Sequence, residues 1–304
     1  MPPARAEEPA PAASEDAAAT SPVVPGTLYV VATPIGNLAD VTLRALDVLG
    51  HVERIAAEDT RRTRTLLARH GVSGPILEPY HEHNEARVAP RLADRLRAGE
   101  AVALVTDAGT PGVSDPGYRL VRAALAAGAP VVAVPGPSAA LCALAASGLP
   151  TDRFLVHGFP PRKPGPRRRM LAALAALPHT LVFFEAPSRI LALVADVQAI
   201  LGDREIAVAR ELTKRFEEIW RGPAGAYLAT RAGREPRGEV TLVVAGLARK
   251  EARAGERAGA GDAAPTRSEM RATGQVRADG SGRGMDPEEA RGRGSPGGRG
   301  QRSG

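Results

Sequence analysis

Three loops rich in glycine, proline and small polar residues are the segments of this sequence best suited to chemistry. They are Thr33–Leu38, Thr106–Gly117 and Pro135–Ala139, and each follows an apolar run. Glycine lets backbone approach a ligand closely, and proline fixes the shape of a loop. The middle loop is the most unusual, with two aspartates, two prolines and three glycines between Asp107 and Gly117. Ordinary turns are the alternative, but three such loops together predict a ligand site.

Charged side chains follow several of the other apolar runs. Glu58–Arg61 comes after one run, Glu185 ends another, and Glu211–Lys214 lies between two more. Because ligands of open α/β sheets bind outside the carboxyl ends of strands, these groups are candidates for the same site. For Asp59 or Thr60 the alternative is a capping role at the start of the following helix.

A dense basic segment is the clearest candidate for phosphate contacts. Arg162, Lys163 and Arg167–Arg169 flank Pro164-Gly165-Pro166. Arginine and lysine at this density suit the backbone of a nucleic acid. A solvated helix start is the alternative, although cations are unfavourable near the positive end of a helix dipole. The pattern therefore favours a ligand role.

Several familiar sites are excluded by their missing motifs. No G-x-G-x-x-G follows the first apolar run, no G-x-x-x-x-G-K-[ST] is present, and no G-x-S-x-G is present. Dinucleotide-binding, P-loop and serine-hydrolase functions are therefore not supported. His81 and His83 lack a third convergent ligand, and Cys142 is the only cysteine. We expect neither a metal site nor an intramolecular disulfide.

Composition predicts a folded centre between two tails. The formal net charge is +6, which is compatible with an RNA partner without requiring one. Residues 1–25 are rich in proline and alanine and have no apolar period, so they are expected to be disordered. The Gly/Arg-rich residues 248–304 have too few apolar side chains to offset their ordering entropy, so they are expected to be disordered as well. The apolar runs are short and no signal sequence is evident, which favours a cytoplasmic location and no membrane span.

Strands and helices alternate in the first half of the folded centre. Apolar runs predict strands at 27–33, 54–57, 101–106 and 130–134, and helical spacing predicts helices at 40–49, with Asp40 as N-cap, and at 60–69, 85–98, 116–127 and 137–147. This alternation is typical of βαβ units. We expect an N-terminal α/β lobe over residues 26–148 with a mostly parallel sheet.

The second half has a different pattern. It predicts strands at 153–157, 180–185, 205–210, 215–221 and 239–245, with helices at 167–177, 187–201 and 223–231. A short connection between the third and fourth of these strands indicates a hairpin, so the sheet should be mixed. We expect a second α/β lobe over residues 149–247, joined to the first near 146–152, with a cleft between the two lobes.

Together these segments resemble the tetrapyrrole-methylase superfamily, the class III methyltransferases, and within it the branch that acts on ribosomal RNA. The resemblance rests on the stretches 28–40, 56–61, 83–85, 105–118, 134–139, 148–154, 158–159, 184–189, 209–214 and 238–246, together with the basic segment. It covers nearly all of residues 26–247. Family members commonly continue into a small helical segment, whereas residues 248–304 show no helical apolar pattern, which puts a contribution from that segment to RNA docking in doubt.

The resemblance implies transfer of a methyl group from S-adenosylmethionine to the ribose 2′-hydroxyl of a cytidine in the decoding region of 16S rRNA. The residues it implies at the cofactor are Pro34, Asp107, Ala108, Gly109, Thr110, Ser138, Ala139, Leu212, Glu239 and Thr241, with Glu185 also a candidate. A ribose hydroxyl is a poor nucleophile, so a proton acceptor would help. The candidates are His83, Asp59, Glu185 and Lys214 (the last only if its pKa is depressed), and the sequence does not choose among them.

RNA is expected to meet two groups of cations. They are Arg61, Arg62 and Arg64 in one group, and Arg162, Lys163, Arg167, Arg168 and Arg169 in the other. The partner would be 16S rRNA or the small ribosomal subunit, and the family implies a homodimer. Two alternatives remain, a methyltransferase for a tetrapyrrole or another small molecule and a non-catalytic RNA-binding protein. The dense basic segment argues against the first, and the complete 107–117 loop argues against the second.

Overall fold

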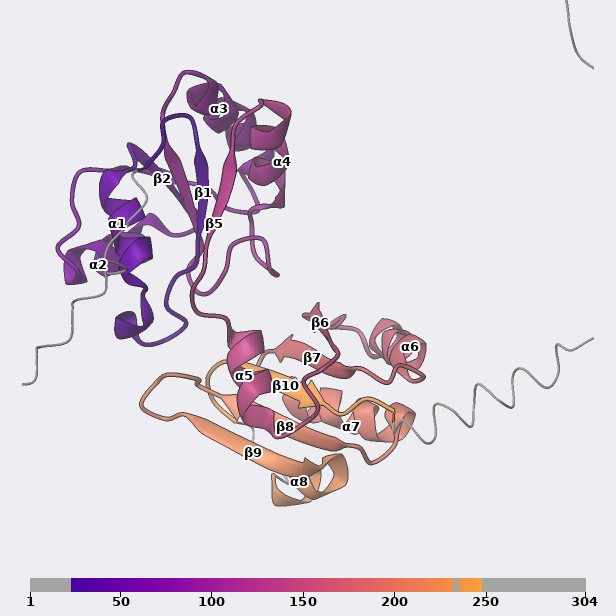
Figure 1. The fold of residues 1–304 in the computed structure, drawn as a ribbon. Helices are drawn as coiled ribbons and strands as arrows, with labels where there is room; N and C mark the ends of the chain where they lie inside the picture. Colours follow the sequence, from indigo (N-terminus) through magenta and orange to yellow (C-terminus); the bar gives the residue numbers. More distant parts are fainter. Residues whose placement is uncertain (1–22, 232–233, 235, 248–304) are drawn as a thin grey trace, which may run out of the picture. The chain divides into compact units, whose positions relative to one another are not determined.

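The computed structural model describes residues 23–231, 234 and 236–247, which form two five-stranded sheets (Figure 1). Of the predicted tails, residues 1–22 and 248–304 lie outside the described residues. Both sheets belong to the same structural unit of the chain. Within the described residues, no helix is long and apolar enough to cross a membrane.

The first sheet is parallel throughout, as the alternation of strands and helices predicts. Its strands are β1 (Leu28–Val31), β2 (Arg54–Ala57), β3 (Ile76–Pro79), β4 (Val102–Val105) and β5 (Val131–Val134), in the order β3-β2-β4-β1-β5. Leu28 of β1 is in register with Val102 of β4 and Val131 of β5. Strands β1, β4 and β5 therefore end at the same edge of the sheet, and the three Gly/Pro-rich loops all leave from that edge.

Alternating residues of these strands pack on helices at opposite faces of the first sheet (Figure 1). One face is covered by α1 (Leu43–His51) and α2 (Thr60–Arg69), and the other by α3 (Glu85–Arg97) and α4 (Tyr118–Ala126). In β2, for example, Ile55 points into the first of these cores and Ala56 into the second. Burial on both faces explains why the central strands β1, β2 and β4 are largely apolar runs.

One strand of the first sheet and one of the helices that cover it differ from the sequence predictions. Strand β3 was not expected, because Ile76–Pro79 is a short edge strand whose residues are all at least partly exposed, so it carries no apolar signal. The helix expected from Asp40 is interrupted, and Leu38–Asp40 is a separate 3₁₀ turn capped by Asn37. Helix α1 begins later, and its N-cap is Thr42, whose hydroxyl accepts a hydrogen bond from Ala45 N–H.

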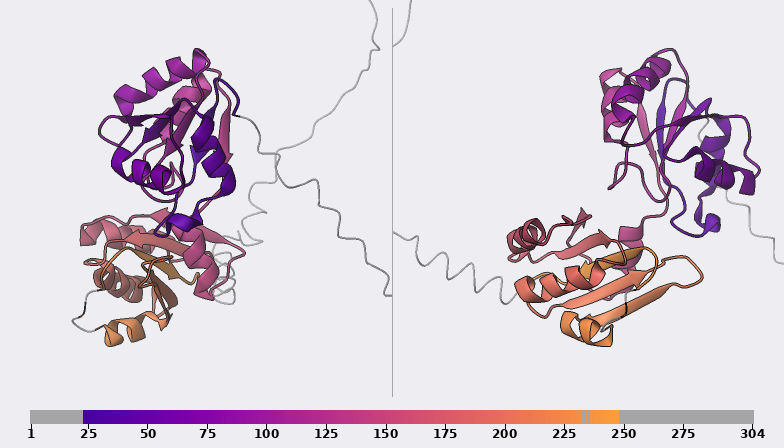
Figure 2. Two further views of the ribbon diagram at one scale, coloured as in Figure 1. Left: turned by 90° about the vertical axis from the view of Figure 1, so that its left-hand side faces the viewer. Right: turned by 180° about the vertical axis from the view of Figure 1, so that it is seen from behind.

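The second sheet is mixed, as expected. Its strands are β6 (Phe154–Gly158), β7 (Thr180–Glu185), β8 (Glu205–Arg210), β9 (Glu218–Pro223) and β10 (Val240–Val244), in the order β6-β7-β10-β8-β9. Only β6 and β7 are parallel, and β8 and β9 form the predicted antiparallel hairpin. One face packs on α6 (Pro164–Leu174), α7 (Ile190–Leu201) and α8 (Ala224–Thr230), and Figure 2 shows α7 and α8 beside this sheet.

The other face of the second sheet is covered by α5 (Ala139–Ser147). Its buried residues Ala140, Ala143 and Leu144 pack on Val182, Ala207, Ala209 and Val243 of that sheet. The predicted boundary after residue 148 would assign this helix to the first lobe. Its packing instead makes the third loop, Pro135–Ala139, the passage from the first sheet to a helix of the second.

Candidate active site

The first two loops are bound to each other through their backbones. Thr33 and Gly109 exchange both backbone hydrogen bonds, each with an N···O distance of 2.9 Å. The Thr33 hydroxyl also donates to the Thr106 carbonyl at 3.0 Å. Gly109 has φ +80, a left-handed conformation that a side chain would strain. These contacts make the two loops one fixed wall.

The first loop also lies very close to the connection between β8 and β9. A Cβ atom added to Gly36 would lie 2.5 Å from Lys214 Cγ and 2.9 Å from the Leu212 carbonyl. Only glycine leaves room for this approach. Loops from both sheets therefore meet at the site.

A cavity of about 410 Å³ lies among these loops. Predicted cofactor residues on its wall are Ala108, Gly109, Thr110, Ser138, Ala139, Glu185, Leu212, Glu239 and Thr241. Positions separated by more than one hundred residues in the sequence thus share one cavity. The wall also includes Val113, Asp115, Phe159 and Phe184, which sequence reasoning did not single out.

A second cavity of about 280 Å³ adjoins the first, and the two share Ile35, Ala108 and Glu239. The remaining predicted cofactor residues, Pro34 and Asp107, line this second cavity together with Arg62 and Lys214. The lining of the second cavity carries charges of both signs. It therefore suits a polar ligand better than an apolar one.

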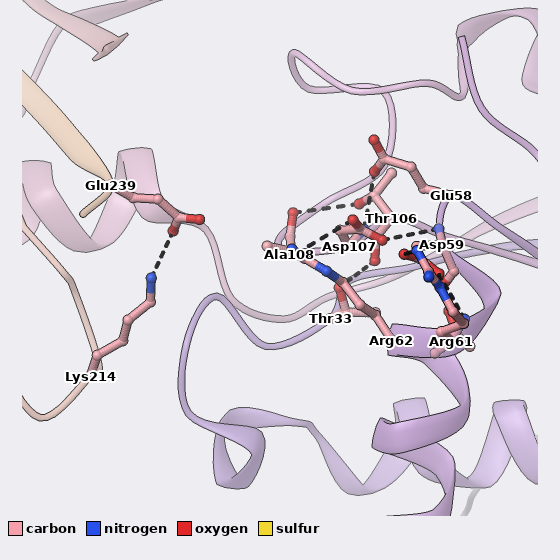
Figure 3. A network of polar contacts seen from close by, with 11 residues as sticks. Thr33, Glu58, Asp59, Arg61, Arg62, Thr106, Asp107, Ala108, Lys214 and Glu239 are labelled. Carbon is pink, nitrogen blue, oxygen red and sulfur yellow. Dashed lines mark hydrogen bonds and ion pairs between the residues drawn. The ribbon is translucent and has the colours of Figure 1, made fainter. Parts of the chain in front are cut away.

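Carboxylates at the ends of β2 and β4 are held together by backbone hydrogen bonds (Figure 3). Asp107 Oδ1 accepts a hydrogen bond from Asp59 N–H at 3.0 Å, and Asp107 N–H donates to Glu58 Oε2 at 3.1 Å. Arg62 lies 3.5 Å from the other Asp107 oxygen and is the cation paired with it. The network fixes the second loop to the end of β2.

Asp59 is the N-cap of α2, so its capping role is confirmed. Its carboxylate accepts hydrogen bonds from Arg61 N–H at 2.8 Å and from the Arg61 guanidinium. The Arg61 side chain, followed by the Arg61 backbone N–H, holds the pKa of Asp59 down to about 2. A carboxylate that is ionised this readily is a weak proton acceptor, which argues against Asp59 as the base.

Lys214 does not meet the condition on which its candidacy rested. Its Nζ donates to Glu211 at 3.0 Å and to Glu239 at 3.1 Å, the latter pair being visible in Figure 3. Burial alone would lower the pKa of Lys214, but the hydrogen bonds to the two carboxylates outweigh it, and the pKa is raised. Lys214 is therefore a cation at neutral pH, with no lone pair to accept a proton.

Glu185 is buried at the end of β7, on the wall of the first cavity. Its Oε1 accepts hydrogen bonds from Arg189 Nε at 2.6 Å and from Ala186 N–H at 2.8 Å. Its Oε2 is buried and has no hydrogen-bond partner among the described residues. An orphaned carboxylate oxygen is costly in a protein interior, which indicates that a ligand donor completes it.

His83, the fourth candidate base, lies elsewhere. It is exposed in the turn before α3, and its ring centroid is 6.0 Å from that of His81. It lines neither of the two cavities. Within the described residues, no group of three or more His, Cys, Asp or Glu side chains is arranged to hold a metal ion.

The basic segment is divided by the start of α6. Arg162 and Lys163 are exposed ahead of the helix, and Arg169 is exposed on it. Arg167 is buried, and its Nε donates to Asp196 at 2.7 Å, while Arg168 Nε donates to the other Asp196 oxygen at 2.7 Å. Arg167 was predicted to contact RNA, but its guanidinium is committed to this buried carboxylate instead. On α2, Arg61, Arg62 and Arg64 are all exposed.

Asp115 is the titratable residue that sequence reasoning passed over. It lines the first cavity, and burial, followed by the charges of Glu58 and Asp107, raises its pKa to about 7. The signal in the sequence was its position in the 107–117 loop. The value could not be foreseen, because it depends on burial and on a carboxylate that is more than fifty residues away in the chain.

Comparison with known proteins gives a consistent result. A family model described as Tetrapyrrole (Corrin/Porphyrin) Methylases matches residues 27–227. A Mesorhizobium japonicum protein named ribosomal RNA small subunit methyltransferase I is 52% identical over 219 residues, covering 71% of this chain and 74% of that protein. A protein of the same name from Xylella fastidiosa is 51% identical over 232 residues, covering 75% and 84%.

A solved structure shows the same fold at low identity. It is a uroporphyrin-III C-methyl transferase from Thermus thermophilus in complex with S-adenyl homocysteine. It is 22% identical to this chain, with a TM-score of 0.52, and the match covers 72% of this chain and 97% of that one. At this identity the likeness concerns the fold alone.

Proposed function

We propose that this chain, which belongs to the tetrapyrrole (corrin/porphyrin) methylase family, transfers a methyl group from S-adenosylmethionine to small-subunit ribosomal RNA. The acceptor is the ribose 2′-hydroxyl of a cytidine in the decoding region of 16S rRNA. The observation that carries the proposal is the gathering of loops from both sheets around one cavity, in a chain about half identical to ribosomal RNA methyltransferases.

The first cavity fits the methyl donor in size and chemistry. Its volume of about 410 Å³ lies within the range of small-molecule sites. Its wall combines small residues such as Gly109 and Ala139 with apolar side chains such as Ile35. The unpartnered Glu185 Oε2 suits a ligand that carries amino or hydroxyl donors.

The protein's main contribution to the reaction is placement. When bound, S-adenosylmethionine supplies an electrophilic methyl group on a sulfonium. The paired Thr33 and Gly109 backbones and the packed start of α5 hold the cavity wall rigid. Fixing two reactants in line can remove roughly 7–11 kcal/mol of a barrier. No metal is needed for this chemistry.

RNA would approach over the exposed cations near the two cavities. Arg62 lines the second cavity, Arg61 and Arg64 share its helix, and Arg162 and Lys163 follow Phe159, which lines the first cavity. The Phe159 side chain is 57% exposed and its ring centroid lies 5.6 Å from that of Phe184. Exposed aromatic rings of this kind stack unpaired bases of RNA.

Reversing the charge of the exposed basic residues tests the RNA-binding part of the proposal. The triple substitution R162E, K163E and R169E should weaken binding of 16S rRNA at least about tenfold and flatten its salt dependence, because fewer phosphate contacts release fewer counterions. Affinity for S-adenosylmethionine, measured by calorimetry, should not change. Arg167 is left intact because its ion pair with Asp196 is structural.

The matched control carries the same charge change elsewhere. Arg44, Arg69 and Arg97 are exposed on α1, α2 and α3. Their triple reversal to glutamate should reduce RNA affinity much less than the first triple variant. Equal losses for both variants would mean that only net charge matters, and would contradict a specific role for the basic segment.

The choice of methyl acceptor is tested by offering ribosomal RNA and a tetrapyrrole to the enzyme in the same assay. With methyl-labelled S-adenosylmethionine, label should enter 16S rRNA or small subunits, and none should enter uroporphyrinogen. Label in the tetrapyrrole alone would contradict the proposal. We also propose that the protein is a homodimer and that it acts in the cytoplasm. Sedimentation analysis of the purified chain tests the dimer.

A further inference from the structure

Asp115 lies on the wall of the first cavity, and no cation of the described residues forms an ion pair with it. Its carboxyl group is half-buried. Among residues 23–231, 234 and 236–247, no side chain or backbone group gives this carboxyl a hydrogen bond or an ion pair. Other aspartates of the site, by contrast, have such partners. Both oxygens of Asp115 are therefore available to a ligand, whereas Glu185 has one such oxygen.

The cations around the cavities are committed to other carboxylates. Arg62 pairs with Asp107, Arg189 with Glu185, and Lys214 with Glu211 and Glu239. The charged groups that raise the proton affinity of Asp115 are Glu58 at the end of β2 and Asp107 at the end of β4, both negative. Nothing on the described elements around it neutralises Asp115. The protonated form of the Asp115 carboxyl group is therefore favoured over its ionised form.

The backbone holds Asp115 in place. Gly112 N–H donates to the Pro116 carbonyl at 3.3 Å, and Val113 N–H donates to the Thr110 carbonyl at 3.3 Å. Ser114 has φ +65, a conformation rare for a residue with a side chain. The Ser114 hydroxyl lies against Gly158 at the end of β6, where an added Cβ would be 2.6 Å away. The Asp115 carboxyl group is thus held by a loop that is fixed by backbone hydrogen bonds and by its contact with β6.

We propose that Asp115 is the proton acceptor of the methyl transfer. The inference rests on the proposed function and adds the residue that activates the acceptor. As the methyl group moves, the O–H bond of the ribose breaks and its electron pair forms the new O–C bond. The C–S bond breaks with its electrons left on sulfur, which becomes a neutral thioether. The proton goes to the Asp115 carboxylate and then to water.

The other candidates for this role are unsuited by their contacts. Asp59 is held ionised by Arg61, and Lys214 already carries its proton. His83 lines neither cavity, and Glu185 is ion-paired with Arg189, while its other oxygen suits the amino or hydroxyl donors of the bound cofactor. A base works best when its pKa is near the working pH, and the pKa of Asp115 is about 7.

The first test is the substitution D115N, which keeps the shape of the side chain but cannot accept the proton. With 16S rRNA or small subunits as substrate, kcat should fall roughly 10²–10⁴-fold. The wild-type kcat should rise about tenfold per pH unit below pH 7 and level off above it, because only the ionised carboxylate is active. The D115N variant should lose this dependence, and D115E should recover part of the rate.

Two further measurements test whether Asp115 is the group whose ionisation sets the pH profile. In the unliganded protein, the folded-state pKa of Asp115 lies above its ordinary value of 3.8, so native stability should fall as pH rises from about 4 to about 7. The Tm of D115N should therefore exceed that of the wild type at pH 8, and the difference should shrink at pH 4. The substitution E58Q removes one neighbouring charge and should move the midpoint of the wild-type pH profile downward.

The outcomes are distinct. A D115N variant with the rate and pH profile of an active wild type overturns the role of Asp115 and leaves the proposed function standing. Loss of S-adenosylmethionine affinity in D115N that matches its loss of rate assigns Asp115 to donor binding and also overturns it. A wild type that does not methylate ribosomal RNA overturns both proposals.

Discussion

Replacing Ala139 with tryptophan is expected to abolish binding of S-adenosylmethionine, raising its Kd more than about 100-fold. Ala139 is the first residue of α5, and its side chain lines the 410 Å³ cavity. It is not among the α5 residues that pack on the second sheet, so the larger side chain can extend into the cavity without disturbing that core. An indole there takes the volume that the donor requires. Calorimetric titration of the purified variant measures the effect.

The control for this variant is A145W on the same helix. Ala145 is exposed and lines neither cavity. The control should bind S-adenosylmethionine as the wild type does, and both variants should unfold at nearly the wild-type temperature. Unchanged binding by a folded A139W variant would place the donor outside this cavity and contradict the site described above.

Replacing Asp196 with alanine is expected to cost about 3–5 kcal/mol of folding free energy, the usual effect of leaving one partner of a buried ion pair uncompensated. The side chains of Asp196 and Arg167 are 4% and 6% exposed, so Arg167 would stay buried without a counter-charge. For a domain of this size the Tm should fall by roughly 10 °C. Thermal unfolding followed by circular dichroism measures it.

The matched control is R168A, which removes the other partner of Asp196. The Arg168 side chain is 63% exposed, so its loss should cost less than about 1 kcal/mol. Hydrogen bonds and charge from the two arginines outweigh burial and hold the pKa of Asp196 below its usual value. The stabilisation by this pair should therefore persist above the ordinary pKa and be lost in acid. Equal destabilisation by D196A and R168A would contradict the burial argument.

Much of the fold could be predicted because strands β1, β2 and β4 of the first sheet are buried on both faces. Runs such as Leu28–Val31 and Val102–Val105 are continuous and apolar, so their positions are clear in the sequence. The edge strand Ile76–Pro79 left no such signal because it is exposed. Helix α5 could not be assigned to the second sheet, because its small apolar residues suit either core equally well.

The sequence predicted which loops form the site, but it did not predict the proton affinities of the side chains there. Glycine and proline mark loops such as Asp107–Gly117 locally, and most of the predicted cofactor residues line one cavity. Proton affinities depend on contacts between distant segments. The Lys214 pair with Glu239 and the proximity of Asp115 to Glu58 cannot be deduced from spacing. Arg167 shows the same limit, since its partner Asp196 lies on another helix.

The most direct test of the central claim is nucleoside mass spectrometry of 16S rRNA incubated with the purified protein and S-adenosylmethionine. The RNA, naked or in small subunits, should come from cells that lack this methylation. We expect 2′-O-methylcytidine to appear in a fragment from the decoding region, and D115N to form it far more slowly. A methylated base, or no modified nucleoside from an enzyme that labels a tetrapyrrole, would contradict the account.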